Sequence, residues 1–331
     1  MKNVNLILIG FGHVGSAFFD LLSRKHSLCR ARYGVDFQIR AVLRTKKASY
    51  LSRFPSPADE LIWNDVPDFQ RILKDTPPGA VVMCLASRER DGQPGVDLNL
   101  TAFRAGWDVA TADKAPLAAE FFRLMSEAGN RGKRLKISGA AAAALPALDT
   151  ALHSLAGAEI VLMEGILNGT SNYILTRIQE GLNYSSALKE ARDKGIAEPD
   201  PSLDVEGWDT AKKMLILSNV VFQENIRLED IPVQGITHLD NTLWETARSS
   251  GQVIKLLGRL RREGTKFQLD VGPRLLSPDH PLAGVRGADK GISFDTDSMG
   301  RVTVTGGRSD PRGAAAALLK DLISLYSKPI F

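Results

Sequence analysis

Cysteine is nearly absent from this sequence, which contains only Cys29 and Cys84 among its 331 residues. Two cysteines are too few for a disulfide framework or a cysteine-rich metal site, so we expect no metal centre and a reducing, cytoplasmic environment. No segment offers the roughly 18 uncharged apolar residues that a membrane-spanning helix needs. The first residues show no signal-peptide pattern. These absences predict a cytoplasmic protein without a membrane anchor.

An excess of charge of one sign is also missing. The 42 Lys and Arg residues nearly balance the 38 Asp and Glu residues, which leaves a formal net charge of +4. No basic run alternates with aromatic residues, so the sequence does not predict nucleic-acid binding. With 44% hydrophobic and 24% charged residues, the chain has the composition of a globular protein long enough for two domains.

The first part of the chain alternates between apolar strand-like runs and helix-length segments. Near-continuous apolar runs are typical of parallel strands covered on both faces. Such runs occupy residues 4–9, 37–43, 79–85 and 108–111, and a helix is expected at 16–24. This alternation predicts a doubly wound parallel sheet of the Rossmann type.

The pattern changes after about residue 135. Strands are predicted at 159–167, 267–271, 291–295 and 302–305, and helices at 171–179, 184–194 and 209–221. The run of small residues at 139–144 fits either a helix or a turn leading into one. A last helix at 312–325 could return to cover the first sheet. We therefore predict a Rossmann domain of residues 1–134 with 304–331, and an α+β domain of residues 135–303.

A glycine-rich turn follows the first strand, with the sequence Gly10-Phe11-Gly12-His13-Val14-Gly15. Gly10 permits a tight turn, Gly12 lets a pyrophosphate approach the backbone, and Gly15 allows close packing of helix and strand. Free N–H groups and the helix dipole favour phosphate at that position. The motif therefore predicts a dinucleotide site, in which His13 is expected to be a packing or turn residue.

The residues after the second predicted strand indicate which dinucleotide binds. An acidic residue there would bind the ribose 2′-hydroxyl of NAD, but the sequence has Arg44-Thr45-Lys46-Lys47. These cations suit a 2′-phosphate, so NADP is favoured and NAD stays possible. A solvated basic turn is the alternative interpretation.

The most informative segment is 195–213. Five carboxylates, Glu198, Asp200, Asp204, Glu206 and Asp209, precede Lys213. Asp209 and Lys213 have i,i+4 spacing, so they share a helical face and can form an ion pair. A lysine placed in this way can orient a substrate oxygen or transfer a proton. Alternatively, the segment is an acidic loop before a helix with a surface salt bridge.

Segment 191–213 resembles the signature of the homoserine dehydrogenases. The matching positions are Ala191, Gly195, Ala197, Asp200, Pro201, Asp204, Val205, Gly207, Asp209 and Lys213. Residues 165–175 are similar to the family's substrate-pocket loop and helix. Residues 111–118 resemble its threonine-x-asparagine-lysine segment, with Asp113 in place of asparagine. Together with the glycine turn, these blocks cover most of the chain in the family's order.

The resemblance implies an NAD(P)-dependent interconversion of L-homoserine and L-aspartate 4-semialdehyde by hydride transfer. Lys213 and Asp209 would be the catalytic pair, and Lys114 would lie near the nicotinamide and the substrate. Which lysine transfers the proton stays open. The resemblance further implies that the α-amino group is bound by Glu198 and Asp204 and that the pocket is lined by Thr170 and Gly169. It also implies a homodimer formed through the sheet of the second domain.

Three departures from the family pattern affect these expectations. Ile196 stands where the family has an aromatic residue. Residues 136–146 replace a block near which some relatives bind a monovalent cation, so that cation site is uncertain. The chain ends at Phe331, so we expect no appended regulatory domain.

Two other functions would also use a dinucleotide-binding domain. Aldehyde oxidation through a thiohemiacetal needs an activated cysteine, whereas Cys84 lies in an apolar strand and Cys29 in a basic stretch. A non-catalytic NADP sensor is the second alternative, and the presence of Lys213, Asp209 and Lys114 argues against it.

Overall fold

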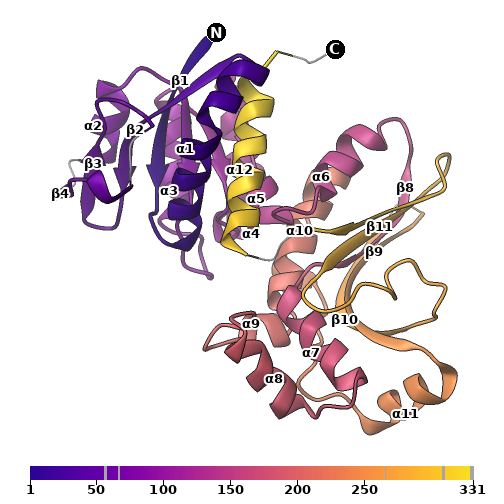
Figure 1. Cartoon of the computed structure of the whole chain (residues 1–331). Helices are drawn as coiled ribbons and strands as arrows, with labels where there is room; N and C mark the ends of the chain where they lie inside the picture. Colours follow the sequence, from indigo (N-terminus) through magenta and orange to yellow (C-terminus); the bar gives the residue numbers. More distant parts are fainter. Residues whose placement is uncertain (56–57, 66–67, 265, 308–309, 329–331) are drawn as a thin grey trace. The chain divides into compact units, whose positions relative to one another are not determined.

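The structure is a computed structural model that describes residues 1–55, 58–65, 68–264, 266–307 and 310–328 (Figure 1). The chain forms two compact units, Met1–Ala144 with Asp310–Phe331, and Leu145–Ser309. The predicted domain boundaries, after residue 134 and before residue 304, differ from this division by ten and six residues and stay a prediction.

The first unit contains a seven-stranded sheet in the order β4-β3-β2-β1-β5-β6-β7. Its strands are β1 (Lys2–Ile9), β2 (Val35–Leu43), β3 (Lys47–Tyr50), β4 (Asn64–Asp65), β5 (Ala80–Met83), β6 (Asp108–Thr111) and β7 (Leu135–Lys136). The five neighbouring strands β2, β1, β5, β6 and β7 are parallel, whereas β3 and β4 form an antiparallel edge. The strand order reverses between β1 and β5, which is where ligands bind in open α/β sheets.

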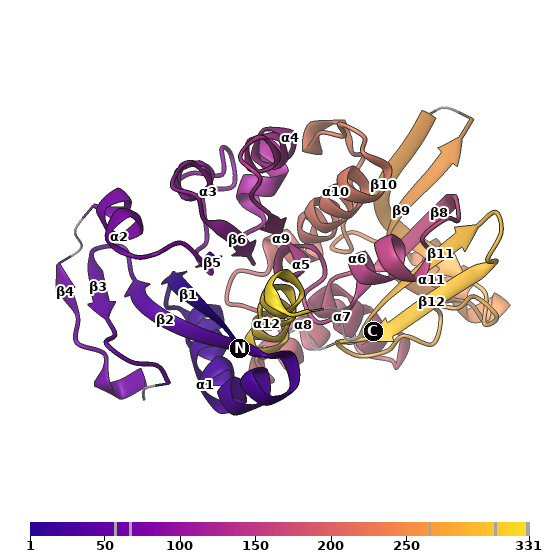
Figure 2. The same ribbon diagram turned by 90° about the horizontal axis from the view of Figure 1, so that it is seen from above.

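Helices cover both faces of this sheet (Figure 2). They are α1 (His13–Tyr33), α2 (Phe69–Asp75), α3 (Gly95–Arg104), α4 (Ala115–Asn130), α5 (Ser138–Ala141) and α12 (Pro311–Tyr326), with a 3₁₀ turn at Ala58–Glu60. On one face, α12 lies beside α1, and Leu318 and Leu322 share a buried core with Phe18 and Leu8. The last helix therefore returns to the first sheet, as the sequence predicted, because its apolar side would otherwise be exposed to water.

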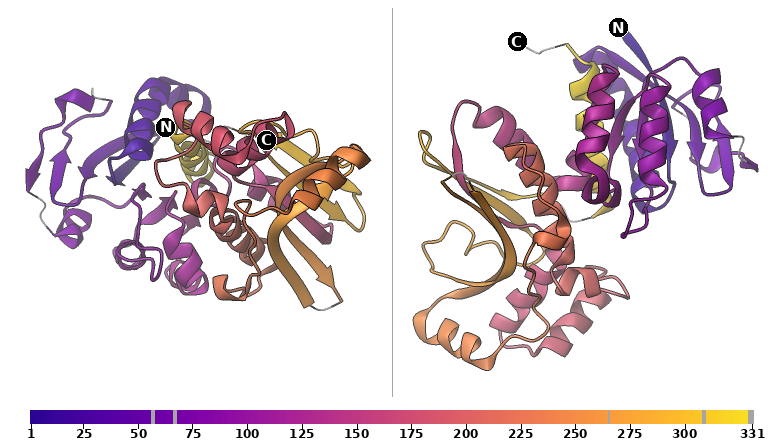
Figure 3. Two further views of the ribbon diagram at one scale, coloured as in Figure 1. Left: turned by 90° about the horizontal axis from the view of Figure 1, so that it is seen from below. Right: turned by 180° about the vertical axis from the view of Figure 1, so that it is seen from behind.

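The second unit contains an antiparallel sheet in the order β10-β9-β8-β11-β12. Its strands are β8 (Ile160–Ile166), β9 (Val253–Glu263), β10 (Lys266–Leu276), β11 (Lys290–Thr296) and β12 (Arg301–Gly306). Its helices are α6 (Ala147–Asp149), α7 (Gly169–Gln179), α8 (Tyr184–Asp193), α9 (Ser202–Val205), α10 (Trp208–Phe222) and α11 (Asn241–Ser250), with a π-helical segment at Thr150–Ser154 and a 3₁₀ turn at Leu228–Asp230. In Figure 3 the helices α7, α8 and α10 lie on one face of this curved sheet.

Helix α10 packs closely against β9, a strand that the sequence analysis did not predict. A Cβ atom added at Gly258 of β9 would lie 2.2 Å from the Cγ atom of Met214 on α10. The missing side chain of this glycine therefore creates the space that Met214 fills. Because α10 carries the predicted catalytic pair, this contact fixes the position of the helix on the sheet.

Candidate active site

The glycine turn joins β1 to α1 at the edge where the strand order reverses. Gly10 has a positive φ of 89°, and a Cβ atom there would lie 2.6 Å from the backbone carbonyl of Cys84, just after β5. A Cβ atom on Gly15 would lie 2.0 Å from the carbonyl oxygen of Gly10. Both positions therefore require glycine so that the turn can pack against β5.

Gly12 differs from these two glycines. It is exposed, and no atom lies within 4 Å of the position that its Cβ atom would occupy. Gly12 is the N-cap residue of α1, where no side chain caps the helix and no acidic residue stands in the first turn. Free backbone N–H groups next to open space fit the pyrophosphate of a dinucleotide. His13 begins the helix and is exposed, whereas Val14 packs against the core.

Arg44 follows β2 and is held by two aromatic rings. Its guanidinium carbon lies 4.2 Å from the centre of the Trp63 ring and 5.3 Å from that of Phe11, which belongs to the glycine turn. The rings of Phe11 and Trp63 are themselves 5.6 Å apart. The structure therefore brings Arg44 to the glycine turn. Trp63 was not predicted to belong to the site, because it lies in a connection without a motif.

Lys114 is the N-cap residue of α4, directly after β6 and Asp113. The buried Asp113 carboxylate accepts a hydrogen bond of 2.5 Å from Ser87 Oγ, and the backbone N–H of Asp113 donates to Thr111 Oγ1. Burial raises the pKa of Asp113. Asp113 therefore fixes the turn that carries Lys114 in the first unit.

In the second unit, Asp209 and Lys213 form the predicted ion pair on α10. Lys213 Nζ lies 2.5 Å from Asp209 Oδ2 and donates a second hydrogen bond of 2.8 Å to the carbonyl oxygen of Leu167. The side chains are only 15% and 8% exposed. The alternative of a surface salt bridge is therefore wrong, because both groups are largely removed from solvent.

Asn168 links two carboxylates of this cluster. Its Nδ2 atom donates to Asp204 Oδ1 at 2.5 Å and to Asp209 Oδ2 at 2.9 Å, while its Oδ1 atom accepts from the N–H of Ser171 and caps α7. Asn168 lies within residues 165–175, which resemble a family block, but no role was predicted for it. An asparagine just before a helix was the available signal, since asparagine is a preferred N-cap residue.

Asp204 is a carboxylate in an unfavourable environment. Burial, and then the negative charge of Asp209, raise its pKa above the ordinary value of 3.8. A ligand ammonium group beside Asp204 would stabilise its charged form. Nearby, Gly169 begins α7, and Thr170 Oγ1 donates to the carbonyl oxygen of Ile196 at 3.0 Å.

Glu198 is not joined to this cluster. Its side chain is exposed, and no hydrogen bond or ion pair connects it to any other residue that the structure describes. The structure thus brings together Lys213, Asp209, Asp204 and Thr170, which were predicted, and adds Asn168.

The two thiols have no activating environment. Burial raises the pKa of Cys29, and burial together with the charge of Asp113 raises the pKa of Cys84. A catalytic cysteine needs the opposite shift, toward the thiolate. These environments argue against aldehyde oxidation through a thiohemiacetal.

Comparison with known proteins identifies the family. Residues 146–323 match the family model described as homoserine dehydrogenase. The chain belongs to the homoserine dehydrogenase family. A homoserine dehydrogenase of Methanocaldococcus jannaschii is 33% identical over 98% of this chain and 99% of its own length. An NAD(+)-dependent homoserine dehydrogenase of Pseudomonas canavaninivorans is 30% identical over 98% of this chain and 97% of its own.

Solved structures agree with this assignment. A crystallised candidate homoserine dehydrogenase from Archaeoglobus fulgidus superposes with a TM-score of 0.88, at 33% identity over 98% of this chain and all of the other. Homoserine dehydrogenases are NAD(P)-dependent oxidoreductases, so the predicted fold, family and enzyme class are confirmed. Among the described residues no helix is long and apolar enough to cross a membrane, and no group of three or more His, Cys, Asp or Glu residues could hold a metal ion.

Proposed function

We propose that this homoserine dehydrogenase interconverts L-homoserine and L-aspartate 4-semialdehyde with NADP, and that Lys213 and Asp209 contact the reacting oxygen. The observation that carries the proposal is the partly buried cluster in which Asn168 joins Asp204 and Asp209 beside Lys213. A largely buried lysine that pairs with Asp209, with the Asp204 carboxylate linked through Asn168, suits a ligand that has both a polar reacting oxygen and an ammonium group.

Asp204 binds the substrate ammonium in this proposal. Its carboxylate is half-buried and carries a raised pKa, so an ammonium group relieves an existing electrostatic cost. Gly169 and Thr170 line the same pocket at the start of α7. Glu198, which is exposed, supplies a second carboxylate to the ammonium when substrate is bound.

Lys213 acts on the substrate oxygen. Two of its three N–H donors are used by Asp209 and by the carbonyl of Leu167, which leaves one for the ligand. When bound, the nicotinamide supplies or accepts the hydride. In the reducing direction Lys213 donates a proton to the forming alkoxide, and Asp209 keeps the ammonium in place. Lys114 is the second cation that we assign to the substrate and nicotinamide.

The cofactor is assigned to residues of the first unit. The N–H groups after Gly12 bind the pyrophosphate, and Gly10, Phe11, His13, Val14 and Gly15 shape the turn around it. Arg44, held by Phe11 and Trp63, binds the 2′-phosphate, so NADP is preferred over NAD. One relative is named as an NAD(+)-dependent homoserine dehydrogenase, so the test of this assignment includes both dinucleotides.

We also propose that the enzyme is a cytoplasmic homodimer. The family resemblance supports a dimer formed through the second unit, and the scarcity of cysteine supports a reducing compartment. Light scattering of the purified enzyme at several concentrations measures the mass, and a monomer of 36.0 kDa at all of them would contradict the dimer.

The first experiment follows homoserine oxidation by the absorbance of the reduced nicotinamide, with NAD and NADP in separate reactions. We expect turnover by the wild type, faster with NADP at low cofactor concentration. The Lys213→Ala variant should lose about 10²- to 10⁴-fold in kcat. Lys189→Ala, at an exposed position on α8, is the control and should keep wild-type activity. A folded wild type without turnover would reject the proposal and favour a non-catalytic NADP sensor.

A further inference from the structure

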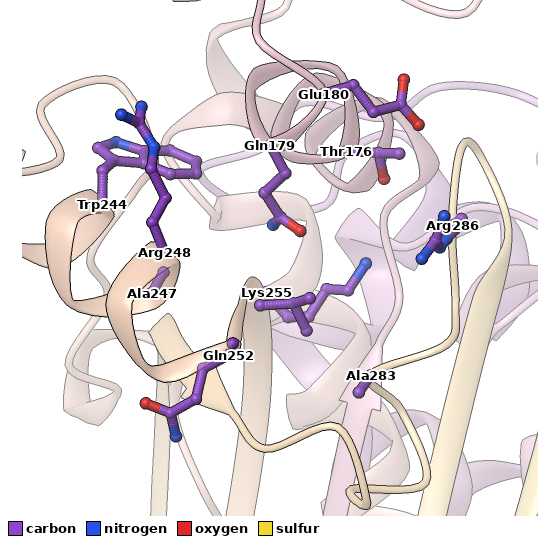
Figure 4. A pocket seen from close by; sticks show the side chains of 12 residues that line it. Thr176, Gln179, Glu180, Trp244, Ala247, Arg248, Gln252, Lys255, Ala283 and Arg286 are labelled. Carbon is purple, nitrogen blue, oxygen red and sulfur yellow. The ribbon is translucent and has the colours of Figure 1, made fainter.

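A cavity lies in the second unit, between α7, α11, the start of β9 and the loop after His280. It has a volume of about 350 Å³, enough for a small metabolite. Figure 4 shows the side chains around it, among them Gln179, Trp244, Lys255 and Arg286. None of these residues belongs to the cluster around Lys213, and the proposed reaction makes no use of them.

Lys255 is the unusual residue of this cavity. Its side chain is 1% exposed, and its ammonium group donates to Asn172 Oδ1 at 3.1 Å and to the carbonyl oxygen of Val285. Neither acceptor carries a full negative charge, and no described carboxylate forms an ion pair with Lys255. A buried lysine without a counter-ion is rare because desolvation opposes its charge.

The other charged groups of the cavity do not neutralise the positive charge of Lys255. Figure 4 shows the Lys255 side chain extending toward Arg286, which approaches from the loop. Burial, and then the charge of Arg286, lower the pKa of Lys255 to about 8, so the lysine is largely charged at neutral pH. Arg248 on α11 adds a third cation. The carboxylate of Glu180 on α7 pairs with Arg177.

The cavity also offers groups that suit an organic ligand. The indole of Trp244 and the side chains of Ala247, Val253 and Ala283 provide apolar wall. Lys255 uses two of its three donors in the structure, so one N–H remains for a ligand. Arg286 is exposed at the rim, where its guanidinium can reach an entering anion.

We propose that this cavity binds a small organic oxyanion, a carboxylate or a phosphate ester, between Lys255 and Arg286. The anion neutralises two facing cations for which no described residue supplies a counter-ion, and its carbon skeleton lies against Trp244. Binding would also stabilise the loop around Arg286. Asn172, which accepts a hydrogen bond from Lys255, donates to the carbonyl oxygens of Val285, Gly287 and Asp289 in that loop. Asn172 lies on α7, the helix that begins with Gly169 and Thr170 of the proposed substrate pocket.

Isothermal titration calorimetry tests the proposal with inorganic phosphate and succinate as separate probes. Saturating NADP is kept in the cell so that phosphate cannot occupy the cofactor turn. We expect at least one probe to bind the wild type, and Arg286→Gln to weaken that binding about tenfold or more. Arg261→Gln, an equal loss of charge at an exposed position on β9, should bind like the wild type. The better of the two probes identifies the preferred head group.

A second readout reports on Lys255 itself. An anion beside Lys255 stabilises its charged form and raises its pKa, so binding near pH 8 must take up a proton. The apparent binding enthalpy of succinate, which is fully ionised at pH 8, should therefore depend on the ionisation enthalpy of the buffer at that pH. Lys255→Met should remove this dependence. If that variant does not fold, the buffer dependence of succinate binding to the wild type at pH 8 still decides.

The proposal is overturned if neither probe binds the wild type at millimolar concentration. It is also overturned if Arg286→Gln binds the probe as well as Arg261→Gln does, or if binding at pH 8 takes up no proton. Since dehydrogenase activity is not the readout, these outcomes do not depend on the proposed reaction.

Discussion

The proposed cofactor turn and the proposed substrate cluster are built from different parts of the polypeptide. The turn consists mainly of backbone, in which Gly10 and Gly15 are packed against their surroundings and Gly12 faces open space. The cluster consists of side chains, in which Asn168, Asp204, Asp209 and Lys213 contact one another in a largely buried position.

This difference shows how one protein can bind an anionic group and a cationic group by different means. A pyrophosphate is bound by N–H groups and a helix dipole, which need no charged side chain and therefore cost little before the ligand arrives. An ammonium group needs a carboxylate, and a buried carboxylate is costly until its partner binds. Added side-chain volume should therefore impair the turn, and removal of a charge should impair the cluster.

The largest effect is expected from crowding the turn. Gly15→Ala places a methyl group 2.0 Å from the carbonyl oxygen of Gly10, so helix and strand must separate, and we expect Tm to fall by roughly 10 °C. Gly12→Ala meets no atom in the free enzyme and should keep the wild-type Tm while NADP binding weakens. Thermal unfolding and cofactor titration of both variants test this contrast. Equal Tm values for the two variants would contradict it.

A smaller but still large effect is expected from removing charge in the cluster. Asp204→Asn should raise the KM for homoserine about a hundredfold or more, because a buried charge contact to the ammonium is lost. In the wild type the same KM should rise as the pH falls, since the raised pKa of Asp204 lets the carboxyl group take up its proton above pH 3.8.

The pH profile distinguishes this role from a structural one. The KM of Asp204→Asn should be high at every pH and lack the acid-side rise. Asp193→Asn, at an exposed position on α8, is the matched control and should reproduce the wild-type profile. An acid-side rise that persists unchanged in Asp204→Asn would show that another group binds the ammonium.

Asn168 tests whether the link between the carboxylates matters apart from the helix cap. Asn168→Ala removes the cap of α7 and leaves two carboxylates without their shared donor, so kcat/KM should fall about ten- to hundredfold. Asn183→Ala removes an equivalent cap from α8 and should cost about 1 kcal/mol in stability with little change in kcat/KM. Equal kcat/KM losses in the two variants would mean that capping alone explains the effect.

The smallest effect is expected at Arg44. Arg44→Gln should raise the KM for NADP about tenfold and leave that for NAD nearly unchanged, because only NADP carries the 2′-phosphate. Trp63→Leu should raise the KM for NADP a few-fold through loss of the cation–π contact. Arg53→Gln, which is exposed, is the control. A parallel change for both cofactors would show that Arg44 does not select NADP.

Local patterns were enough to predict much of this architecture. The apolar runs located β1, β2, β5 and β6, and the i,i+4 spacing correctly paired Asp209 with Lys213. The short antiparallel strands β3 and β4 and the charged strand β9 were not predicted. Their sequences lack clear alternation, and pairing with a neighbouring strand decides their conformation.

The sequence by itself determined the order of strands and helices, the glycine turn and the family signature, because each depends on residues close together in the chain. Only the tertiary structure decided that Asn168 meets Asp204 and Asp209, that Trp63 stacks on Arg44, and that Lys255 is buried facing Arg286. Those contacts join residues far apart in the sequence. Their formation depends on how the helices pack on the sheets, which no local pattern specifies.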